Sequence, residues 1–547
     1  MPVTPSYPGI YIEELPSSSR TIIPAPTSIT VFIGYTHPFQ GECANPAAPR
    51  WGEAIQVFNF TEYERYFGGL YRNPEVSSHV ADAVYQFFLN GGSNAYVVGL
   101  RPAYYTPATI AVPIQTLIRY VAPATGSIAG IKFTSKHLTD ENNRVSITIR
   151  NFQTKGLTVN NTADILITYG SLVETFRDVV IESGLAAAVA APEAFIARKL
   201  AKSAIVKIEP DNGVAFPGSY TAVAPPVPLT LDIGAMSTPA TDAVPADYTP
   251  FRALDFTKVF DADTSLDKVD IFNLLVIPGV SDSGIWAKAL DYCERKLAFF
   301  VMDPPKDASA DGMGASLLRI QEVVDGPTMP RNSSNGALYF PYLKTIDPLS
   351  GRTLRQPPSG FVAGIYARTD ARRGVWKAPA GLEASIANTT GVVEEGKMTD
   401  MRQGVVNEKG VNVLRFFPGS GTVVWGARGI GVSTALQQWK YVPVRRTALF
   451  IEQTLMRNLG WVVFEPNDEP LWTAIRISIE GFMLSLFRQQ AFQGSTPSQA
   501  FLVQCDATTT TQEDINKGIV NIVVGFRPLK PAEFVIIKIA QLAGQVQ

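Results

Sequence analysis

The sequence of 547 residues has a formal net charge of −2, and 46% of its residues are hydrophobic while 18% are charged. This composition excludes a disordered chain, and the length predicts roughly two to four domains, because a single hydrophobic core rarely grows beyond about 300 residues. The near-zero charge provides no basic surface of the kind that nucleic acids bind. We therefore expect a folded, multidomain protein without a nucleic-acid partner.

The start of the chain and its cysteines indicate where the protein is made. Residues 1–9, MPVTPSYPG, lack the basic and then apolar layout of a signal peptide, and no run of about 18 apolar residues predicts a membrane span. Cys43, Cys293 and Cys505 are far apart and lie beside apolar residues, so we expect buried free thiols. These features predict a soluble chain made in the cytoplasm.

An extended segment and the beginning of an α/β layer are predicted within residues 1–100. Residues 8–23, PGIYIEELPSSSRTII, read as two short strands around a serine turn, with no neighbour that could bury them. Residues 27–36 are typical of a strand, residues 78–90 follow helical spacing, and residues 94–100 predict a buried strand. This order favours an α/β body, and it leaves open what segment 8–23 pairs with.

The α/β pattern resumes in the second half of the chain. Apolar strands are predicted at 271–279 and 298–305, and helices at 285–297 and 358–374. These strands are apolar on both faces, which is typical of a parallel sheet covered on both sides. Residues 102–250 are instead rich in Thr, Ala and Pro, with a hairpin-like alternation at 143–152. We therefore expect a separate domain inserted into a surface loop of the body.

The last part of the chain predicts helices followed by apolar strands. The strands are expected at 438–444, 519–526 and 534–540, and the helices at 446–460 and 467–490. Asn467 or Asp468 can cap the longer helix, and Pro470 suits its first turn. The last predicted strand is apolar and has no partner strand left in the sequence. As for segment 8–23, it is therefore open what this strand pairs with.

Candidate catalytic motifs fail on their chemistry. Residues 391–397, GVVEEGK, match a P-loop, but Met398 replaces the Ser or Thr that holds Mg²⁺, and no apolar strand precedes them. The histidines His37, His79 and His137 accompany no G-x-S-x-G motif, and no His or Cys pair has zinc-ligand spacing. We therefore expect no catalytic residue, no cofactor and no metal site, which disfavours the alternative of a hydrolase.

Several long segments carry a resemblance to a known family. They are PPSGFVAGIYARTDARRGVWKAPAG (357–381), VNVLRFFPGSGTVVWGARG (411–429), WKYVPVRRTALFIEQTLMRNLGWVVFEPNDEPLW (439–472) and CDATTTTQEDINKGIVNIVVGFRPLKPAEFVIIKIAQ (505–541). Together with the opening PGIYIEE, they resemble tail sheath proteins of contractile bacteriophages and of phage-like contractile injection systems. The resemblance covers residues 1–100 and about 251–547, whereas residues 102–250 carry no motif that we can assign.

The resemblance implies a multidomain fold of the α/β class with mixed α+β character. Its body is expected to be subtilisin-like in topology but without proteolysis, because the sequence has no Asp–His–Ser set. The expected division is an N-terminal arm at 1–20, a body at 21–101 plus 251–430, a β-rich outward-facing insertion at 102–250, a C-terminal inner domain at 431–520, and a C-terminal strand or arm at 521–547.

The resemblance also suggests what the two terminal segments pair with. In the family, both arms add strands to a sheet in neighbouring subunits, which is β-augmentation, and main-chain hydrogen bonds provide the affinity. The expected arm residues are Ile10, Tyr11, Ile12, Glu13, Val535, Ile536, Ile537 and Ile539, and the expected acceptor residues are Ile519, Ile522, Val523 and Val524. The alternative is a terminal strand that folds back on its own body.

The resemblance places the contact with an inner tube around residues 440–495, because the C-terminal domain lies innermost in the family. The basic side chains expected to face an acidic tube are Lys440, Arg445, Arg446 and Arg457. Exposed ion pairs are weak, which suits a contact that must be released. The alternative is that Arg445 and Arg446 pair within the subunit.

The function implied by the resemblance is structural and involves no catalysis. Stacked hexameric rings form a sheath around the tube in an extended, high-energy state, and contraction drives the tube through a target envelope. The implied partners are further copies of the chain, the inner tube protein, and baseplate and terminator (cap) proteins, with no nucleic acid and no membrane insertion. Assembly is expected in the cytoplasm, as part of a phage virion or a phage-like injection particle, released or membrane-anchored.

A tube subunit or capsid component is the alternative structural class, although tube subunits are far shorter.

Overall fold

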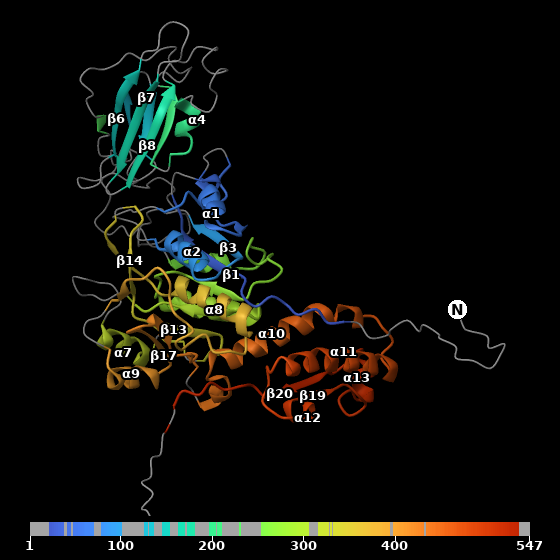
Figure 1. Cartoon of the computed structure of the whole chain (residues 1–547). Helices are drawn as coiled ribbons and strands as arrows, with labels where there is room; N and C mark the ends of the chain where they lie inside the picture. The colour runs from blue at the N-terminus through green and yellow to red at the C-terminus, as the bar shows by residue number, and fades with distance from the viewer. Residues whose placement is uncertain are drawn as a thin grey trace, which may run out of the picture.

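The computed structural model describes residues 21–37, 41–44, 48–70, 78–100, 125–128, 131–135, 145–153, 162–169, 172–180, 196–203, 205–210, 229–230, 253–305, 316–327, 329–330, 332–349, 351–393, 398–431, 434–534 and 536. Over these residues the protein is a mixed α/β fold with several sheets and 12 α-helices (Figure 1). His137 and most of the predicted arm residues lie outside the described residues.

One eight-stranded sheet forms the centre of the protein, in the order β18-β17-β13-β12-β11-β1-β3-β2. Its strands are β1 Thr30–Tyr35, β2 Ala54–Val57, β3 Ala95–Leu100, β11 Leu274–Val276, β12 Phe299–Met302, β13 Gly336–Phe340, β17 Val411–Phe417 and β18 Gly421–Trp425. The pairs from β3 to β17 are parallel, and β2 and β18 form antiparallel edges. The predicted parallel sheet is confirmed.

Strand β1 joins the two parts of the sheet that come from distant parts of the chain. Thr30 pairs with Ala95 of β3 on one side and with Leu274 of β11 on the other. The strand order therefore reverses at β1, as in doubly wound α/β sheets. Every residue of β1 is buried, because helices cover both faces of the sheet.

Alternate strand residues reach two separate hydrophobic cores, one on each face of the sheet. Phe32 and Val97 pack under α1 Phe60–Phe67, α2 Val80–Leu89 and α8 Ser359–Arg373. Val31 and Val98 pack under α5 Ala253–Thr257, α6 Ser283–Arg295, α7 Leu317–Asp325 and α9 Asp400–Asn407. Because successive strand residues point to opposite faces, one apolar strand serves both cores. The predicted helices at 78–90, 285–297 and 358–374 are confirmed. We refer to this sheet with its helices as the body.

Two glycines let α8 pack closely against α2. A Cβ atom at Gly360 would lie 2.6 Å from Ala83 Cα, and one at Gly364 would lie 2.7 Å from Asn90 Cβ. Neither position has room for a side chain, because such distances are shorter than van der Waals contact. The glycine spacing in SGFVAGIY therefore sets the depth at which α8 is buried.

Strands from the middle of the chain form two smaller sheets. One consists of β10-β6-β7-β8 and the other of β4-β5-β9. The strands are β4 Thr125–Ile128, β5 Ile131–Ser135, β6 Val145–Gln153, β7 Thr162–Tyr169, β8 Leu172–Val180, β9 Val206–Pro210 and β10 Leu229–Thr230. Residues of β5 to β9 share a core with α4 Ile196–Leu200, and Figure 1 shows β6, β7 and β8 above the body. A further small sheet, β15-β14-β16, consists of β14 Leu343–Ile346, β15 Thr353–Gln356 and β16 Gly391–Val392.

The C-terminal unit, residues 442–526, is built on two long helices. Its elements are α10 Val442–Asn458, α11 Glu469–Arg488, α12 Pro497–Ala500, β19 Phe501–Gln504, α13 Gln512–Asn516 and β20 Val523–Phe526. The 3-10 helices of the chain are η1 Glu42–Ala44, η2 Lys258–Phe260, η3 Thr434–Trp439 and η4 Gly460–Val462. The predicted helix at 467–490 is confirmed as α11, where the Asp468 side chain accepts a hydrogen bond from the Glu469 N–H.

The strand predicted at 438–444 is wrong. Residues 434–439 form η3, and Val442 already begins α10. Pro443 has no N–H to donate to a strand ladder, whereas its fixed backbone angle suits the first turn of a helix. Tyr441 retains only an isolated bridge to Arg428.

The strand predicted at 519–526 is shorter than expected, and this affects two of the predicted acceptor residues. Ile519 donates its N–H to the Asp514 carbonyl, because Gly518 adopts a positive φ of 72° and turns the chain back on α13. Asn521 donates its N–H to the Thr510 hydroxyl. Ile519 and Ile522 therefore precede the strand, while Val523 and Val524 lie within β20.

All three cysteines are buried free thiols, as predicted. Burial raises the pKa of Cys43 to about 12 and that of Cys505 to about 11, so neither is a thiolate at neutral pH. In the part of the chain that the structure describes, no helix combines the length and the hydrophobicity that crossing a membrane requires.

Candidate assembly interface

The N-terminal end of the described chain lies along helix α10. The backbone N–H of Ile23 donates to Asn458 Oδ1 at 2.9 Å, and Asn458 Nδ2 donates back to the Ile23 carbonyl at 2.9 Å. Two residues further along, the Ala25 N–H donates to Thr454 Oγ1 at 3.1 Å. Figure 1 shows this blue segment beside α10, running toward the N-terminus. Residues 23–25 are thus fixed on the C-terminal unit.

The same segment is tied to the sheet by a buried amide pair. Asn273 Nδ2 donates to the Pro26 carbonyl at 2.8 Å, and Asn273 Oδ1 accepts the Ile29 N–H at 3.0 Å. Gln453 of α10 accepts from Asn273 Nδ2 at 2.7 Å and donates to the Phe272 carbonyl. These bonds join the body, α10 and the N-terminal segment in one network of satisfied polar groups.

Arg446 completes this junction, and its position corrects a prediction. Its guanidinium makes two parallel bonds to Asp370 at 2.9 and 2.6 Å, and the two side chains are only 3% and 4% exposed. Burial alone would lower the pKa of Arg446, but the Asp370 carboxylate holds it above the ordinary value. Arg446 also donates to the Thr27 carbonyl. It is an internal link between the body and α10, so it does not face a tube.

The other predicted tube-facing residues differ in exposure. Arg445 is largely buried, donates to Asn335 and pairs with Glu452 at 3.2 Å. The alternative, in which Arg445 and Arg446 pair within the chain, is therefore the arrangement seen. Arg457 is partly exposed and pairs with Asp270 at 2.7 Å, while Lys440 lies over the Tyr441 ring. Lys440 and Arg457 thus remain the candidates for a tube contact.

The β19–β20 sheet is small, and its strands offer apolar side chains to solvent. Phe501 pairs with Phe526 at one end and Gln504 with Val523 at the other. One side of the sheet packs on α11 through Val503, whereas Leu502 is 52% exposed and Val523 46%. Among the described residues the sheet has only these two strands, so each has an outer edge without a strand neighbour. Such an edge is a template for a strand from another chain.

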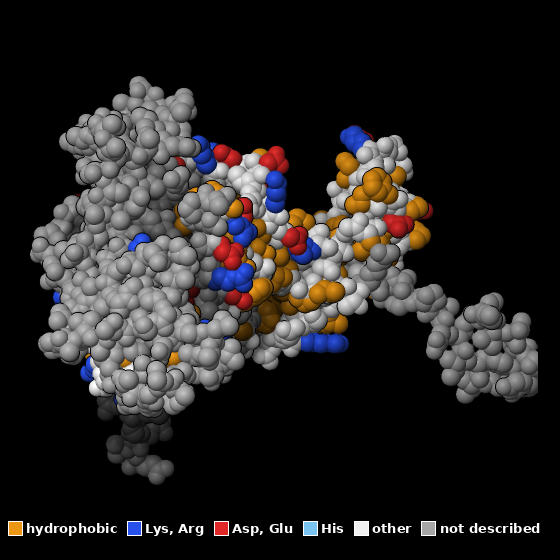
Figure 2. All heavy atoms as spheres, turned by 90° about the horizontal axis from the view of Figure 1, so that it is seen from above, with side chains coloured by type: hydrophobic (Ala, Val, Ile, Leu, Met, Phe, Trp, Pro, Cys, Tyr) orange, Lys and Arg blue, Asp and Glu red, His pale blue; other side chains and the backbone are white. Residues whose placement is uncertain are grey.

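Of the predicted arm residues, only Ile536 lies within the described part of the chain. Ile536 is 82% exposed and lies in no strand, so the structure does not place it against its own body. The remaining arm residues, Ile10 to Glu13, Val535, Ile537 and Ile539, lie outside the described residues. In the space-filling view, hydrophobic side chains are also visible on the C-terminal unit where it projects from the body (Figure 2).

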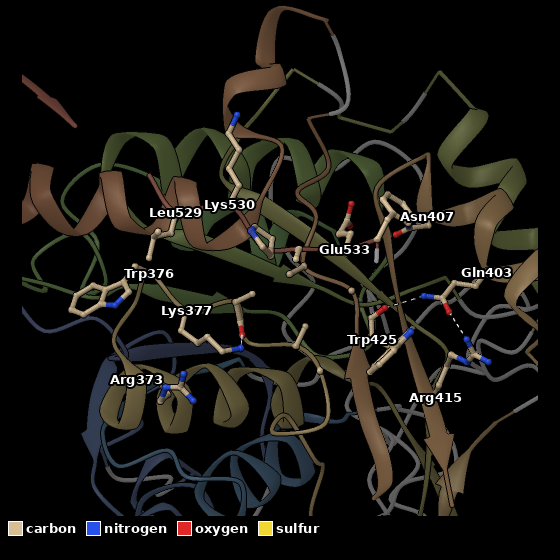
Figure 3. A pocket seen from close by; sticks show the side chains of 18 of the residues that line it. Arg373, Trp376, Lys377, Gln403, Asn407, Arg415, Trp425, Leu529, Lys530 and Glu533 are labelled. Atoms are coloured by element: carbon tan, nitrogen blue, oxygen red, sulfur yellow. Dashed lines mark hydrogen bonds between the residues drawn. The ribbon is translucent and has the colours of Figure 1, made fainter. Parts of the chain in front are cut away.

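A groove of about 890 Å³ separates the body from the residues that follow β20. Figure 3 shows Trp376, Lys377 and Trp425 on the body side, and Leu529, Lys530 and Glu533 on the opposite side. Gln403 fixes one wall by donating to the Trp425 carbonyl and accepting from Arg415. The groove therefore lies where the chain leaves the C-terminal unit.

A ligand site in an open α/β sheet is expected outside the carboxyl ends of the strands, and the carboxylate that follows β12 there is bonded within the chain. Asp303 follows β12; its Oδ1 accepts the Ser359 N–H at 2.7 Å, and its Oδ2 accepts the Ser359 hydroxyl at 2.6 Å and the Gly279 N–H at 2.8 Å. Asp303 thus caps α8, because Pro358 at the N-cap has no capping side chain. Burial raises the pKa of Asp303 to about 6.

The described histidines are also parts of the interior. His37 and His79 are both buried, and the His79 ring lies against Gly279, where a Cβ atom would come within 2.5 Å of it. Over the described ranges, no cluster of three His, Cys, Asp or Glu side chains has the arrangement that holds a metal ion. Sequence reasoning missed both Asp303 and the bonds to α10; the available signal for the latter is the polar spacing of Arg446, Thr454 and Asn458 on a largely apolar helix.

Two family models together match half of the chain. Residues 261–430 match the central domain of phage tail sheath proteins, and residues 434–541 match the phage tail sheath C-terminal domain. The chain belongs to the phage tail sheath family. The boundary between the two models falls at residues 431–433, directly before η3 and α10, so the sheath chain divides where the body meets the C-terminal unit.

Two curated relatives support this assignment. A tail sheath protein of Burkholderia phage BcepMu is 28% identical over 167 residues, which is 30% of the sheath chain and 35% of the relative. A protein described as a prophage major tail sheath protein of Pseudomonas aeruginosa strain UCBPP-PA14 is 24% identical over 266 residues, 48% of the sheath chain and 62% of the relative. The matched stretches thus cover less than two thirds of these relatives.

The fold is also similar to solved sheaths over nearly the whole chain. The contracted helical sheath of the anti-feeding prophage matches with a TM-score of 0.55 at 21% identity, covering 98% of the sheath chain and 100% of its own. The contracted sheath complex of the extracellular injection system PVC matches with a TM-score of 0.55 at 21% identity, covering 98% of both chains. These likenesses show the fold of the sheath chain.

Proposed function

We propose that the sheath chain is the repeating subunit of a contractile sheath, assembled as stacked hexameric rings around an inner tube. Contraction of this sheath drives the tube through a target envelope. The observation that carries the proposal is the β19–β20 sheet, whose outer edges and exposed Leu502 and Val523 are available to another chain. Membership of the tail sheath family supports the same conclusion.

The contact between subunits is β-augmentation at this sheet. The segments that supply the strands are residues 10–13 of the N-terminal arm and residues 535–539 near the C-terminus, each from a neighbouring copy. Alternating side chains suit this role, since Ile10 and Ile12 fall on one face of an extended strand and Tyr11 and Glu13 on the other. Each backbone hydrogen bond adds only about 0.5–1.5 kcal/mol, so the contact becomes strong through its number of bonds and repeats.

The energy for contraction lies in the interfaces between subunits. The extended state is metastable, and contracted subunits bury more surface against one another, so the release needs no nucleotide hydrolysis. The absence of a catalytic role is supported by Asp303, Ser359 and His79, which are buried and take part in packing. The body keeps a subtilisin-like topology without an enzymatic function.

The remaining contacts follow from the order of the domains. Residues 102–250 form an outward-facing insertion, which is supported by strands β4 to β10 pairing only with one another among the described strands. The C-terminal unit faces the tube, and Lys440 and Arg457 contribute basic side chains to that contact. Baseplate and terminator proteins bind the ends of the sheath. The particle is a phage tail or a phage-like injection system assembled in the cytoplasm.

Electron microscopy of the purified chain and of two truncated chains tests this proposal. The full chain should form tubular sheaths, while chains lacking residues 1–20 or residues 534–547 should keep their circular dichroism and form none. The reason is that each truncation removes a donated strand and leaves the body unchanged. Tubes of normal length from either truncated chain would contradict the proposal.

A further inference from the structure

A largely shielded ion pair joins the residues after β20 to the body. Arg428 Nε donates to Glu533 Oε1 at 2.7 Å, and a terminal Arg428 nitrogen donates to Glu533 Oε2 at 2.6 Å. The two side chains are only 6% and 16% exposed. Two parallel bonds of this kind fix the orientation as well as the distance of the partners.

Further hydrogen bonds hold both members of the pair in place. Arg428 also donates to the Asn407 carbonyl at 2.8 Å, and its backbone N–H donates to Asn412 Oδ1 at 2.7 Å. The Tyr441 hydroxyl donates to Glu533 Oε2 at 3.1 Å. Helix α9, strand β17 and the residue before α10 thus all support one site, and Arg428 is held in it by contacts other than Glu533 as well.

The pair is ionised at neutral pH. Burial alone would raise the pKa of Glu533, but the hydrogen bonds and charge of Arg428 keep it below the ordinary value. The bond to Glu533 likewise raises the pKa of Arg428. The two charges are largely shielded from solvent, so removing either partner would leave the other poorly compensated.

Residues 527–533, which we call the strap, are therefore held at both ends. At its start, the Arg527 N–H donates to the Ala500 carbonyl at 2.8 Å, and its carbonyl accepts the Gln493 N–H at 3.0 Å. At its end, Glu533 binds Arg428 across the groove shown in Figure 3. The next two described residues, Phe534 and Ile536, are 74% and 82% exposed, so Glu533 is the last described residue that is largely covered.

We propose that the Arg428–Glu533 pair is a clamp that sets where the C-terminal arm leaves its own subunit. When the ion pair is formed, the free part of the C-terminal arm begins at Phe534. When the ion pair is broken, the free part would begin after β20 and include the strap. The difference is the strap, which could add about 23 Å of reach when extended, at about 3.3 Å per residue. This inference rests on the proposed donation of the arm to a neighbour.

The clamp selects the neighbour that receives the arm. A linker brings its end to a site most effectively when its length matches the distance to that site. A fixed exit point and a short arm favour one acceptor sheet, whereas a longer arm reaches several. The clamp thereby contributes to the order of the sheath without touching the acceptor.

The distance between two spin labels on the unassembled chain tests the clamp itself. The labels are placed on Ala532→Cys in the strap and Ala378→Cys on the body side of the groove, since the three native cysteines are buried. Glu533→Gln keeps the shape of the side chain but removes its charge, and we expect the distance distribution to broaden and to shift to longer distances. Lys530→Gln is the matched control, because it changes a charge on the same strap without touching Arg428. Charge exchange in Arg428→Glu with Glu533→Arg should restore part of the narrow distribution that Glu533→Arg alone removes. An unchanged distribution in Glu533→Gln would overturn the proposal.

Assembly of the same variants separates this inference from the proposed function. Glu533→Gln should yield shorter or branched sheaths, while the chain lacking residues 534–547 should yield none. Sheaths of normal length and order from Glu533→Gln would show that the clamp does not select the neighbour, and would leave the sheath function intact. Normal sheaths from the truncated chain would contradict the sheath proposal, whereas the spin-label distances would still decide whether the clamp exists.

Discussion

The main sheet and the β19–β20 sheet differ in how far the chain itself covers their strands. All six residues of β1 are buried, and the edge strand β18 is covered by residues 381–386, which bond to Thr422 and Val424. In the β19–β20 sheet one face packs on α11, and Leu502 and Val523 remain about half exposed. The β18 edge of the main sheet is covered by its own chain, whereas the described β19–β20 sheet has outer edges without a strand neighbour.

This difference separates folding from assembly along one chain. Changes in the core of the body or at its junction with α10 should alter the free energy of unfolding, because those residues are buried within the chain. Changes on the outer edges of the β19–β20 sheet should leave the free energy of unfolding almost unchanged and alter assembly. The predictions below test this separation with residues from each region.

The largest effect is expected at the junction of the two regions. Arg446→Met should lower the free energy of unfolding by about 3–5 kcal/mol, because it leaves the Asp370 carboxylate buried without its partner. Denaturant unfolding measures this loss. Arg457→Met is the control: its partner Asp270 is 79% exposed, so the change should stay within about 1 kcal/mol. Equal effects of the two variants would refute a special role for the buried pair.

The second prediction concerns pH and the body alone. Burial raises the pKa of Asp303 to about 6 in the folded chain. Between about pH 4 and 6, the folded chain therefore keeps a proton on Asp303 that the unfolded chain has already released. The resulting stabilisation is complete below about pH 4 and is lost as the pH rises through 6, by about 3 kcal/mol in total. Asp303→Asn should flatten this part of the pH profile of unfolding, whereas Asp400→Asn, at an exposed site, should not. An unchanged profile in Asp303→Asn would exclude Asp303 as its source.

A smaller effect is expected from overpacking between α2 and α8. Gly364→Ala should destabilise the body by about 1–3 kcal/mol, because its Cβ atom would meet Asn90 Cβ at 2.7 Å. Gly404→Ala in α9 is the matched control, since nothing lies within 4 Å of a Cβ atom there. Thermal unfolding of both variants checks this prediction, and equal melting temperatures would show that α8 can shift away from α2 without loss.

The smallest effect on stability is expected at the exposed sheet. Leu502→Ser with Val523→Thr should change the free energy of unfolding by less than about 0.5 kcal/mol, because both side chains are half exposed. Sheath length in electron micrographs should nevertheless fall, since the donated strand loses apolar contacts. Val173→Thr, on the exposed face of β8, serves as the control for assembly. Sheaths of wild-type length from the double variant would place the subunit contact elsewhere.

Hydrophobic periodicity and glycine positions predicted those strands and helices whose signals lie within a short stretch of sequence. The apolar strands at 27–36 and 94–100 and the helix at 78–90 were predictable, because periodicity and glycine positions lie within a few residues of one another. The strand at 438–444 was mispredicted because an apolar, β-branched run can also begin a buried helix. Pro443 was the residue that could have decided between the two.

The polar contacts of the interface could not be predicted, because their partners are far apart in the sequence. Asn458 meets Ile23, and Arg428 meets Glu533, only once the body and the C-terminal unit have packed together. Arg446 is a second example, in which the sequence predicted an exposed side chain and the fold buries it. Its charge suggested a surface contact, and only the fold brings Asp370 and the Tyr366 ring to it.

The hydrogen bonds between the N-terminal segment and α10 also determine how the chain responds to force. From Ile23 through Ala25 to Thr27, the segment meets Asn458, Thr454 and Arg446, so it runs antiparallel to the helix. A pull on the preceding residues along the α10 axis loads these bonds together in shear. A pull perpendicular to that axis instead breaks the Asn458 contact first and the others one after another. The rupture force of the segment in a single-molecule experiment should therefore depend on the direction of the pull.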